Sequence, residues 1–361
     1  MPRYYGARLD AYRRTAAAHP DGPVDVSIGS PVDDTAAAAQ QALAAAGSAR
    51  GYPATAGTSE LREAVVGWLT RVAGASGVTE EMVLPVLGAK EFVAGAPLQL
   101  GLAPGDVVAV PELAYPTYGV GVALAGCTVT TYATPRDLVR SDARPALVWL
   151  NSPSNPDGAV WSPEETAELV AWARSAGTLV VSDECYLEFG WEDQPVSVLD
   201  PRVHGGDLTG LLAVHSESKR SNAAGYRLAT VSGDAALVRE LLDIRRNVGL
   251  IMPTPQQRVL TALVADDEHV RRQREVYARR RALLRGALEG AGFVIARSTG
   301  GLYLWAALAD GTPDPAAHLA ARGILAVPGR PTAPRGRGFV RVALTVNDRD
   351  VQRVVDRLAE G

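Results

Sequence analysis

The sequence predicts an α/β protein in which a large domain, a three-layer and mostly parallel sheet, is accompanied by a smaller α+β domain at the C-terminal end. Two observations predict this class. The chain has 361 residues, which is more than one hydrophobic core usually organises, so a second domain is expected. In the middle of the chain, short apolar runs alternate with helical stretches, which is the pattern of a parallel sheet covered by helices on both faces.

The predicted strands of the large sheet are runs rich in valine and leucine. Each run is too apolar to face water on either side, so each should be buried under helices. They lie at residues 107–110, 146–150, 178–181 and 211–214. Between two of them, Ser162 followed by Pro163 and two glutamates predicts a helix start, and Gly177 predicts the stop of a helix that reaches about residue 175.

The pattern changes after about residue 240 to long charged helical stretches, such as residues 270–289. Shorter strand-like pieces follow at residues 301–305 and 338–344. We therefore expect three parts: an N-terminal segment (1–40) that packs with the small domain, a large domain (41–245) and a small C-terminal domain (246–361).

Composition narrows the class of function. The formal net charge of −4 offers nucleic acid no general attraction, and no run of about 18 apolar residues predicts a membrane span. Cys127 and Cys185 are far apart and form no CxxC pattern, and the five histidines show no pairing typical of metal ligands, so neither a disulfide framework nor a metal site is expected. We expect a cytoplasmic protein that acts on small molecules.

Three segments that follow predicted strands carry the strongest chemical signal. Residues 151–158 hold two asparagines and two prolines in a turn, and Asp183 and Tyr186 follow the next strand. Lys219 follows a third strand, with Arg227 eight residues further on. Open α/β sheets bind ligands at the carboxyl ends of their strands, so an amide, a carboxylate and a lysine should meet in one crevice.

The order of these segments resembles the fold-type I, class I/II aminotransferases, which depend on pyridoxal 5′-phosphate (PLP). The resemblance covers nearly the whole chain and includes residues 51–62 and the arginine strand at residues 339–344. More narrowly, residues 215–227 resemble the actinobacterial branch of N-succinyldiaminopimelate aminotransferases, which implies a dicarboxylic amino donor such as glutamate and an acceptor that is a 2-oxo acid.

The resemblance implies roles around the cofactor ring. Lys219 would form the Schiff base, or internal aldimine, with PLP and shuttle the proton. Asp183 would pair with the pyridine nitrogen and keep it protonated, which makes the ring an electron sink. Asn155 and Tyr186 would bind the phenolic oxygen, and Tyr115 would stack on the ring face. The plainer interpretation of both tyrosines is core packing with a satisfied hydroxyl.

The cofactor phosphate should lie where a glycine turn opens an apolar helix. There the backbone N–H groups of Ala89 and Lys90 would meet the anion. By resemblance, Ser216, Ser218 and Arg227 would complete this phosphate site. For Lys90 only the backbone is implicated, because its side chain reads as an ordinary charge on a helix surface.

Substrate recognition is predicted at Arg341, whose guanidinium would bind a carboxylate with two hydrogen bonds. The alternative for Arg341 is a salt bridge at the end of a strand. Gly29 would let the N-terminal segment pass close to the substrate, and Asn155 is also expected to contact the substrate. The resemblance also implies that Tyr52 reaches the phosphate of a neighbouring subunit, so the enzyme would be a homodimer with shared active sites.

Three departures from the family pattern leave the reaction open. Glu217 stands between Ser216 and Ser218, where relatives have an apolar residue, and should turn away, pair with an arginine such as Arg220, or touch an altered substrate. Residues 327–338 lack an aromatic-glycine element, and glycines 300 and 301 replace bulkier residues. An alternative function is therefore a specialised-metabolism PLP enzyme that performs elimination, replacement or carbon–carbon bond formation. A ligand-sensing regulator would need a fused DNA-binding domain, and the segment before residue 25 is too short for one.

Overall fold

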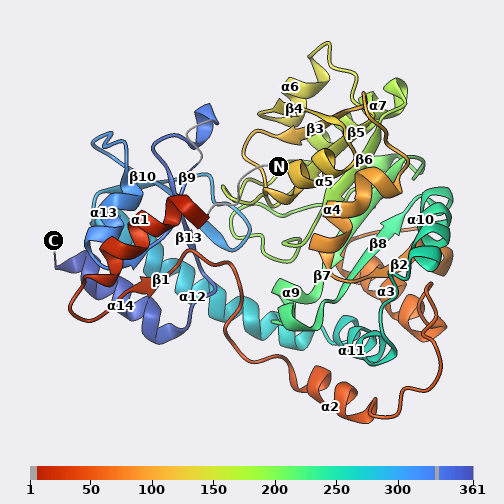
Figure 1. Ribbon diagram of the computed structural model, residues 1–361, viewed down its shortest axis with the longest axis horizontal. Coiled ribbons are helices and arrows are strands. Elements are labelled where there is room, and N and C mark those ends of the chain that lie inside the picture. The colour runs from red at the N-terminus through yellow and green to blue at the C-terminus, as the bar shows by residue number, and fades with distance from the viewer. Residues whose placement is uncertain (1–5, 330–332, 361) are drawn as a thin grey trace.

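A seven-stranded sheet organises the larger part of the molecule (Figure 1). The computed structural model describes residues 6–329 and 333–360. Six of the seven strands run in the same direction and only β8 is antiparallel to its neighbours, in the spatial order β2-β8-β7-β6-β5-β3-β4. The strands are β2 (Val83–Val86), β3 (Val107–Pro111), β4 (Thr128–Tyr132), β5 (Leu147–Asn151), β6 (Leu179–Asp183), β7 (Leu211–Ser216) and β8 (Ala229–Gly233).

Side chains that alternate along these strands enter two separate cores, one on each face. Val148 and Leu150 of β5 belong to one core with helices α3 (Ser59–Val72), α7 (Pro163–Ala176) and α11 (Thr254–Val264). Leu147 and Trp149 belong to the other core with α4 (Ala89–Gln99), α5 (Thr117–Leu124) and α10 (Ala235–Val248). Alternate residues of a strand point to opposite faces, so a strand with both sets buried must lie between two helix layers. The predicted three-layer, mostly parallel sheet is confirmed.

The helix predicted after Ser162 has the expected ends. Ser162 accepts a hydrogen bond from the Glu165 N–H at 3.2 Å, and the Glu165 carboxylate accepts one from the Ser162 N–H at 3.2 Å, which is a complete capping box. Gly177 closes α7 in the left-handed conformation with φ of 66°. The remaining short helices of this part are α2 (Ala37–Ala45), α6 (Pro135–Val139), α8 (Pro201–His204), α9 (Glu217–Arg220) and the 3-10 turns η1 (Glu80–Met82) and η2 (Ala224–Tyr226).

A four-stranded antiparallel sheet forms the smaller part, in the order β12-β13-β10-β9. Its strands are β9 (Phe293–Ala296), β10 (Tyr303–Leu308), β12 (Val327–Pro328) and β13 (Val340–Ala343). Helices α12 (Glu268–Gly290), α13 (Pro315–Ala321) and α14 (Asp348–Ala359) pack around it, with the 3-10 turn η3 (Pro334–Gly336). The strand expected at residues 301–305 begins later, at Tyr303, because Gly301 has φ of 74° and makes a turn. Residues 330–332 of the divergent segment 327–338 lie outside the described residues.

The N-terminal segment joins the smaller sheet. Helix α1 (Gly6–Ala17) packs against α13, and β1 (Val24–Asp25) pairs in parallel with β11 (Ile324–Leu325), as the grouping in Figure 1 shows. Helix α11 packs instead against α2 and α3, so the core of the larger sheet includes residues that follow residue 245. The division of the chain at residues 40 and 245 remains a prediction.

Within residues 6–329 and 333–360, no helix combines the length and the apolar character that a membrane span requires.

Candidate active site

The carboxyl ends of three neighbouring strands meet at one cavity of about 560 Å³. Asn151 ends β5 and lies opposite Asp183, which ends β6, while Ser216 ends β7. Parallel strands bring their carboxyl ends to one edge of a sheet, which is why segments far apart in the sequence converge here. Twelve of the thirteen predicted site residues line this cavity: Gly29, Ala89, Lys90, Tyr115, Asn155, Asp183, Tyr186, Ser216, Ser218, Lys219, Arg227 and Arg341.

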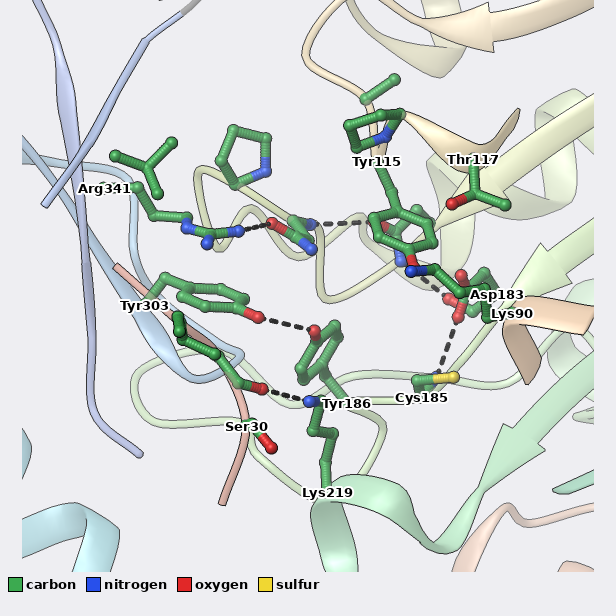
Figure 2. A pocket seen from close by; sticks show the side chains of 18 of the residues that line it. Ser30, Lys90, Tyr115, Thr117, Asp183, Cys185, Tyr186, Lys219, Tyr303 and Arg341 are labelled. Carbon is green, nitrogen blue, oxygen red and sulfur yellow. Dashed lines mark hydrogen bonds between the residues drawn. The ribbon is translucent and has the colours of Figure 1, made fainter. Parts of the chain in front are cut away.

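Lys219 enters the cavity from α9, a four-residue helix directly after β7 (Figure 2). Ser216 caps this helix, because its hydroxyl accepts a hydrogen bond from the Ser218 N–H at 3.2 Å. The Lys219 ammonium donates to the carbonyl oxygen of Gly29. A Cβ at Gly29 would collide with the ring of Tyr303, so glycine is required for the N-terminal segment to pass this close. The amine is thus held at the junction of the two parts of the molecule.

Asp183 is a buried carboxylate with neutral partners. Its side chain accepts hydrogen bonds from the Tyr118 hydroxyl at 2.8 Å and from the Cys185 N–H at 3.3 Å. Desolvation raises the pKa of Asp183, although the hydrogen bonds from Cys185 and Tyr118 oppose that rise. Among the described residues, neither an arginine nor a lysine forms an ion pair with Asp183, so the carboxylate can accept a cationic group of a bound molecule.

Arg341 reaches across from β13 to the turn after β5. Its Nη1 donates to the Asn155 Oδ1 at 2.8 Å and its Nη2 donates to the Ser27 carbonyl at 2.7 Å. The buried Nε has no hydrogen-bond partner in the described part of the chain. A buried donor without a partner is costly, so the Arg341 guanidinium is prepared to bind a carboxylate.

Two buried tyrosines stand beside Arg341. The hydroxyls of Tyr186 and Tyr303 are 3.0 Å apart, and the Arg341 guanidinium lies 4.2 Å from the centre of the Tyr303 ring. Burial alone would raise the pKa of the Tyr303 phenol, but the positive charges of Arg341 and Lys219 lower it. Burial, followed by the neighbouring Tyr303, raises the pKa of Tyr186 well above its ordinary value. Tyr186 therefore keeps its proton and can donate a hydrogen bond.

The glycine turn before α4 has the shape predicted for an anion site. Gly88 has φ of 86° and caps α4 without a side chain, so within the described part of the chain no side chain caps the first amides of the helix, those of Ala89 and Lys90. A Cβ at Gly88 would collide with the Arg227 guanidinium, which therefore lies directly over the turn. Helix N-termini attract anions, so this corner of the cavity could hold a phosphate.

Tyr115 lines the cavity above Asp183, where Figure 2 shows its ring beside Lys90. The Lys90 Nζ is 6.0 Å from the centre of this ring, and the Tyr118 ring meets it edge-on with centres 5.9 Å apart. Burial is the largest cause of a raised pKa of Tyr115. Its ring face remains available for stacking against a planar ligand.

Tyr52 is the one predicted site residue that does not line the cavity in this chain. Its side chain is 100% exposed, in the segment between α2 and α3. Its expected role concerns a second subunit, so that role stays a prediction.

The residues that departed from the family pattern have structural contacts of their own. The Glu217 carboxylate is buried, pairs with Arg220 at 2.8 Å and accepts a hydrogen bond from Ser221, and it does not line the cavity. A Cβ at Gly300 would lie 2.7 Å from the Val160 side chain and 2.9 Å from that of Pro153. Glu217 thus pairs with the arginine that we expected, and Gly300 is explained by close packing.

Two residues in the site were missed by the sequence analysis. Tyr118, in the first turn of α5, does not line the cavity but donates a hydrogen bond to Asp183, and its closeness in sequence to Tyr115 was the one available signal. Tyr303 contacts Tyr186 and Arg341, but its apolar strand gave no sign that distinguishes it from a core residue.

Comparison with known proteins identifies the family. Residues 23–358 match the family model for aminotransferase class I and II. The chain belongs to this family. The aminotransferase is 53% identical over 365 residues to the probable aminotransferase Rv1178 of Mycobacterium tuberculosis, an alignment that covers 99% of this chain and 85% of the relative.

Other relatives carry more specific names. The 4-dedimethylamino-4-oxo-anhydrotetracycline transaminase OxyQ of Streptomyces rimosus is 48% identical to this aminotransferase over 99% of both chains. The LL-diaminopimelate aminotransferase of Aquifex aeolicus is 29% identical over 99% of this chain and 96% of its own. An aminotransferase structure from Neisseria meningitidis superposes with a TM-score of 0.88 at 27% identity, covering 100% and 98% of the two chains. The enzyme class and fold type I are therefore established, and the matches with diaminopimelate aminotransferases are distant.

Proposed function

We propose that this aminotransferase binds PLP through Lys219 and, in the cytoplasm, transfers an amino group from glutamate or another dicarboxylic amino acid to a 2-oxo acid. One observation carries the proposal: the Lys219 amine and the Asp183 carboxylate, whose described hydrogen-bond partners are neutral, meet in one cavity. The glutamate donor rests on the resemblance of residues 215–227. N-Succinyl-LL-diaminopimelate belongs to the candidate substrates for the same reason.

The residues present fit PLP. Asp183 is a buried carboxylate whose described partners are neutral, so it would hold the protonated pyridine nitrogen. The uncapped amides of Ala89 and Lys90 would hold the phosphate, together with Arg227 and the two serines of β7 and α9. Tyr115 would cover the ring, and Asn155 and Tyr186 would bind its phenolic oxygen. When bound, PLP supplies an aldehyde that takes up the amino group and a ring that delocalises negative charge from the substrate Cα.

The protein side of the reaction follows from the same contacts. Arg341 would bind the substrate carboxylate and orient the Cα–H bond, with its unpartnered Nε available as a donor. The Lys219 Nζ would accept the proton from the substrate Cα and deliver it to the cofactor within the same half-reaction, and it would move a proton in the opposite direction when the 2-oxo acid is converted. Gly29 lets the N-terminal segment approach the amine closely, which helps to exclude water.

The alternative reactions, elimination, replacement or carbon–carbon bond formation, lose only part of their support, because residues 327–329 of the divergent segment line the cavity. They rested on residues 217, 300 and 301 and on the segment 327–338. Glu217 is turned into a buried ion pair away from the cavity, and Gly300 packs against Pro153 and Val160. A second candidate keeps an observation in its favour: the 48% identity to OxyQ over nearly the full length supports a ketone acceptor in specialised metabolism.

The absorption spectrum of the purified protein tests the proposal. We expect the band of a lysine-bound PLP, loss of that band on borohydride treatment, and a peptide that carries the reduced cofactor at Lys219. L-Glutamate should convert the spectrum to that of the pyridoxamine form, and Lys219→Ala should abolish the reducible band. Absence of PLP binding refutes the proposed cofactor site. Binding without any response to glutamate or to other dicarboxylic amino acids refutes the proposed donor and returns the alternative reactions to first place.

A further inference from the structure

A fully buried arginine lies behind the phosphate corner of the cavity. Arg245, on α10, has a side chain that is 0% exposed. Its two terminal nitrogens form a fork with the Glu91 carboxylate, with Nη1 to Oε1 at 2.9 Å and Nη2 to Oε2 at 2.8 Å. Its Nη1 also donates to the side-chain amide oxygen of Gln99, Oε1, at 3.0 Å. Arg245 thus contacts both the first turn and the last residue of α4.

Glu91 connects this arginine to the glycine turn. Its Oε2 accepts a hydrogen bond from the Leu87 N–H at 3.2 Å. Leu87 and Glu91 flank the stretch of Gly88, Ala89 and Lys90, so one carboxylate holds both sides of the turn that presents the amides. A glycine at φ of 86° places no side-chain restraint on this backbone, and the restraint must come from its neighbours.

The charge balance also depends on Arg245. A carboxylate in the first turn of α4 stands close to the amides that would bind a phosphate dianion, and like charges repel most strongly where water is excluded. The guanidinium of Arg245 compensates the charge of Glu91. Planar forked pairs fix orientation as well as charge, which a lysine at position 245 could not do.

We propose that Glu91 and Arg245 are positioning residues for the cofactor phosphate. Neither lines the cavity, and they act by fixing the Gly88 turn and by neutralising the carboxylate next to it. This inference rests on the proposed PLP site. Glu91 and Arg245 should therefore strengthen the binding of a cofactor that carries the phosphate group, and they should not affect the binding of a cofactor that lacks it.

The test compares PLP with pyridoxal, which lacks the phosphate, on the cofactor-free protein. The double variant Glu91→Leu/Arg245→Met removes both charges together, because removal of one partner would leave a buried unpaired charge. We expect affinity for PLP to fall about tenfold or more, and affinity for pyridoxal to fall less than about twofold. The matched control is Asp33→Leu/Arg280→Met, another forked pair with an arginine that is 4% exposed, which should leave the ratio of the two affinities unchanged.

A milder variant keeps the test decisive if the double variant fails to fold. Gln99→Leu removes only the third contact of Arg245, and PLP affinity should fall about twofold to threefold with pyridoxal affinity unchanged. An equal loss for both ligands, or no loss for either, overturns the inference while the proposed function stands. If the unaltered protein binds neither ligand, the proposed function itself fails.

Discussion

Burial raises the pKa of Asp183, and the hydrogen bond from Tyr118 opposes that rise. The hydroxyl of Tyr118 donates at 2.8 Å to a carboxylate whose pKa burial raises. A neutral Asp183 cannot pair with a protonated pyridine nitrogen. Affinity for PLP should therefore be full above the pKa of Asp183 in the cofactor-free protein and should fall as pH drops through it.

The substitution Tyr118→Phe tests this linkage. Removal of a hydrogen bond to the charged carboxylate raises the pKa of Asp183 further, so the loss of PLP affinity should begin at a higher pH than in the unaltered protein. The measurement is the PLP dissociation constant across the acidic and neutral range. Tyr132→Phe is the control, because the Tyr132 hydroxyl is also buried but donates to the Trp149 carbonyl at 2.6 Å. Coincident pH profiles for Tyr118→Phe and the unaltered protein would contradict the argument.

The site residues that could be predicted from the sequence are polar residues at the ends of apolar strands. The residues that were missed contact the side chain of another site residue. Asp183, Asn155 and Lys219 follow apolar strands, so their polar character was conspicuous. Tyr303 lies within an apolar strand, and its link to Arg341 depends on how two distant strands pair. The pairing of β10 with β13 is part of the tertiary structure and cannot be predicted from a local sequence pattern.

Among the elements, α7 shows how local chemistry specifies a boundary. Ser162 and Glu165 satisfy each other's backbone amides at the start of the helix, and Ser162 does not line the cavity. We expect Ser162→Ala to lower stability by about 1 kcal/mol and to leave aminotransferase activity unchanged.

Chemical denaturation measures this effect through the shift of the unfolding midpoint. Ser175→Ala is the matched control, since Ser175 is an exposed residue near the other end of the same helix and donates only to the Trp172 carbonyl at 2.7 Å. An equal shift for both variants would show that the capping box contributes nothing beyond the general cost of the substitution.

Elements with strong local signals were predictable, and short ones were not. The four apolar strands and α7 appear within one or two residues of their expected bounds. The two-residue strands β1 and β11 pair across 300 positions of sequence, as Val24 with Ile324, and have no periodicity to detect. Helix α9 is only four residues long, and its position follows from the Ser216 cap and from the ion pair of Glu217 with Arg220.

At the scale of the whole molecule, the cavity collects residues from both sheets and from the N-terminal segment. Gly29 and Ser27 come from that segment, Arg341 from the smaller sheet, and Lys219 from the larger one. The family resemblance adds a further source, because it implies that Tyr52 serves a neighbouring subunit. Tyr52 is fully exposed and Val32 is 54% exposed, so both side chains are accessible to a partner.

Complementation between two inactive variants tests the predicted homodimer. Lys219→Ala lacks the amine but retains Tyr52, whereas Tyr52→Ala retains the amine. If each active site uses Tyr52 from the other subunit, a mixed dimer contains one intact site, and random mixing should restore about a quarter of the unaltered activity.

The measurement requires that subunits exchange, so the two variants are unfolded and refolded together and the mass of the product is determined. A mass of twice the 37.9 kDa chain with restored activity supports shared sites. The same mass without restored activity would show that Tyr52 serves its own chain or no site at all. A product with the mass of one chain would contradict the predicted homodimer. Refolding each variant separately controls for activity that recovers without mixing. Shared sites would also explain why Tyr52, alone among the predicted site residues, lies away from the cavity of its own chain.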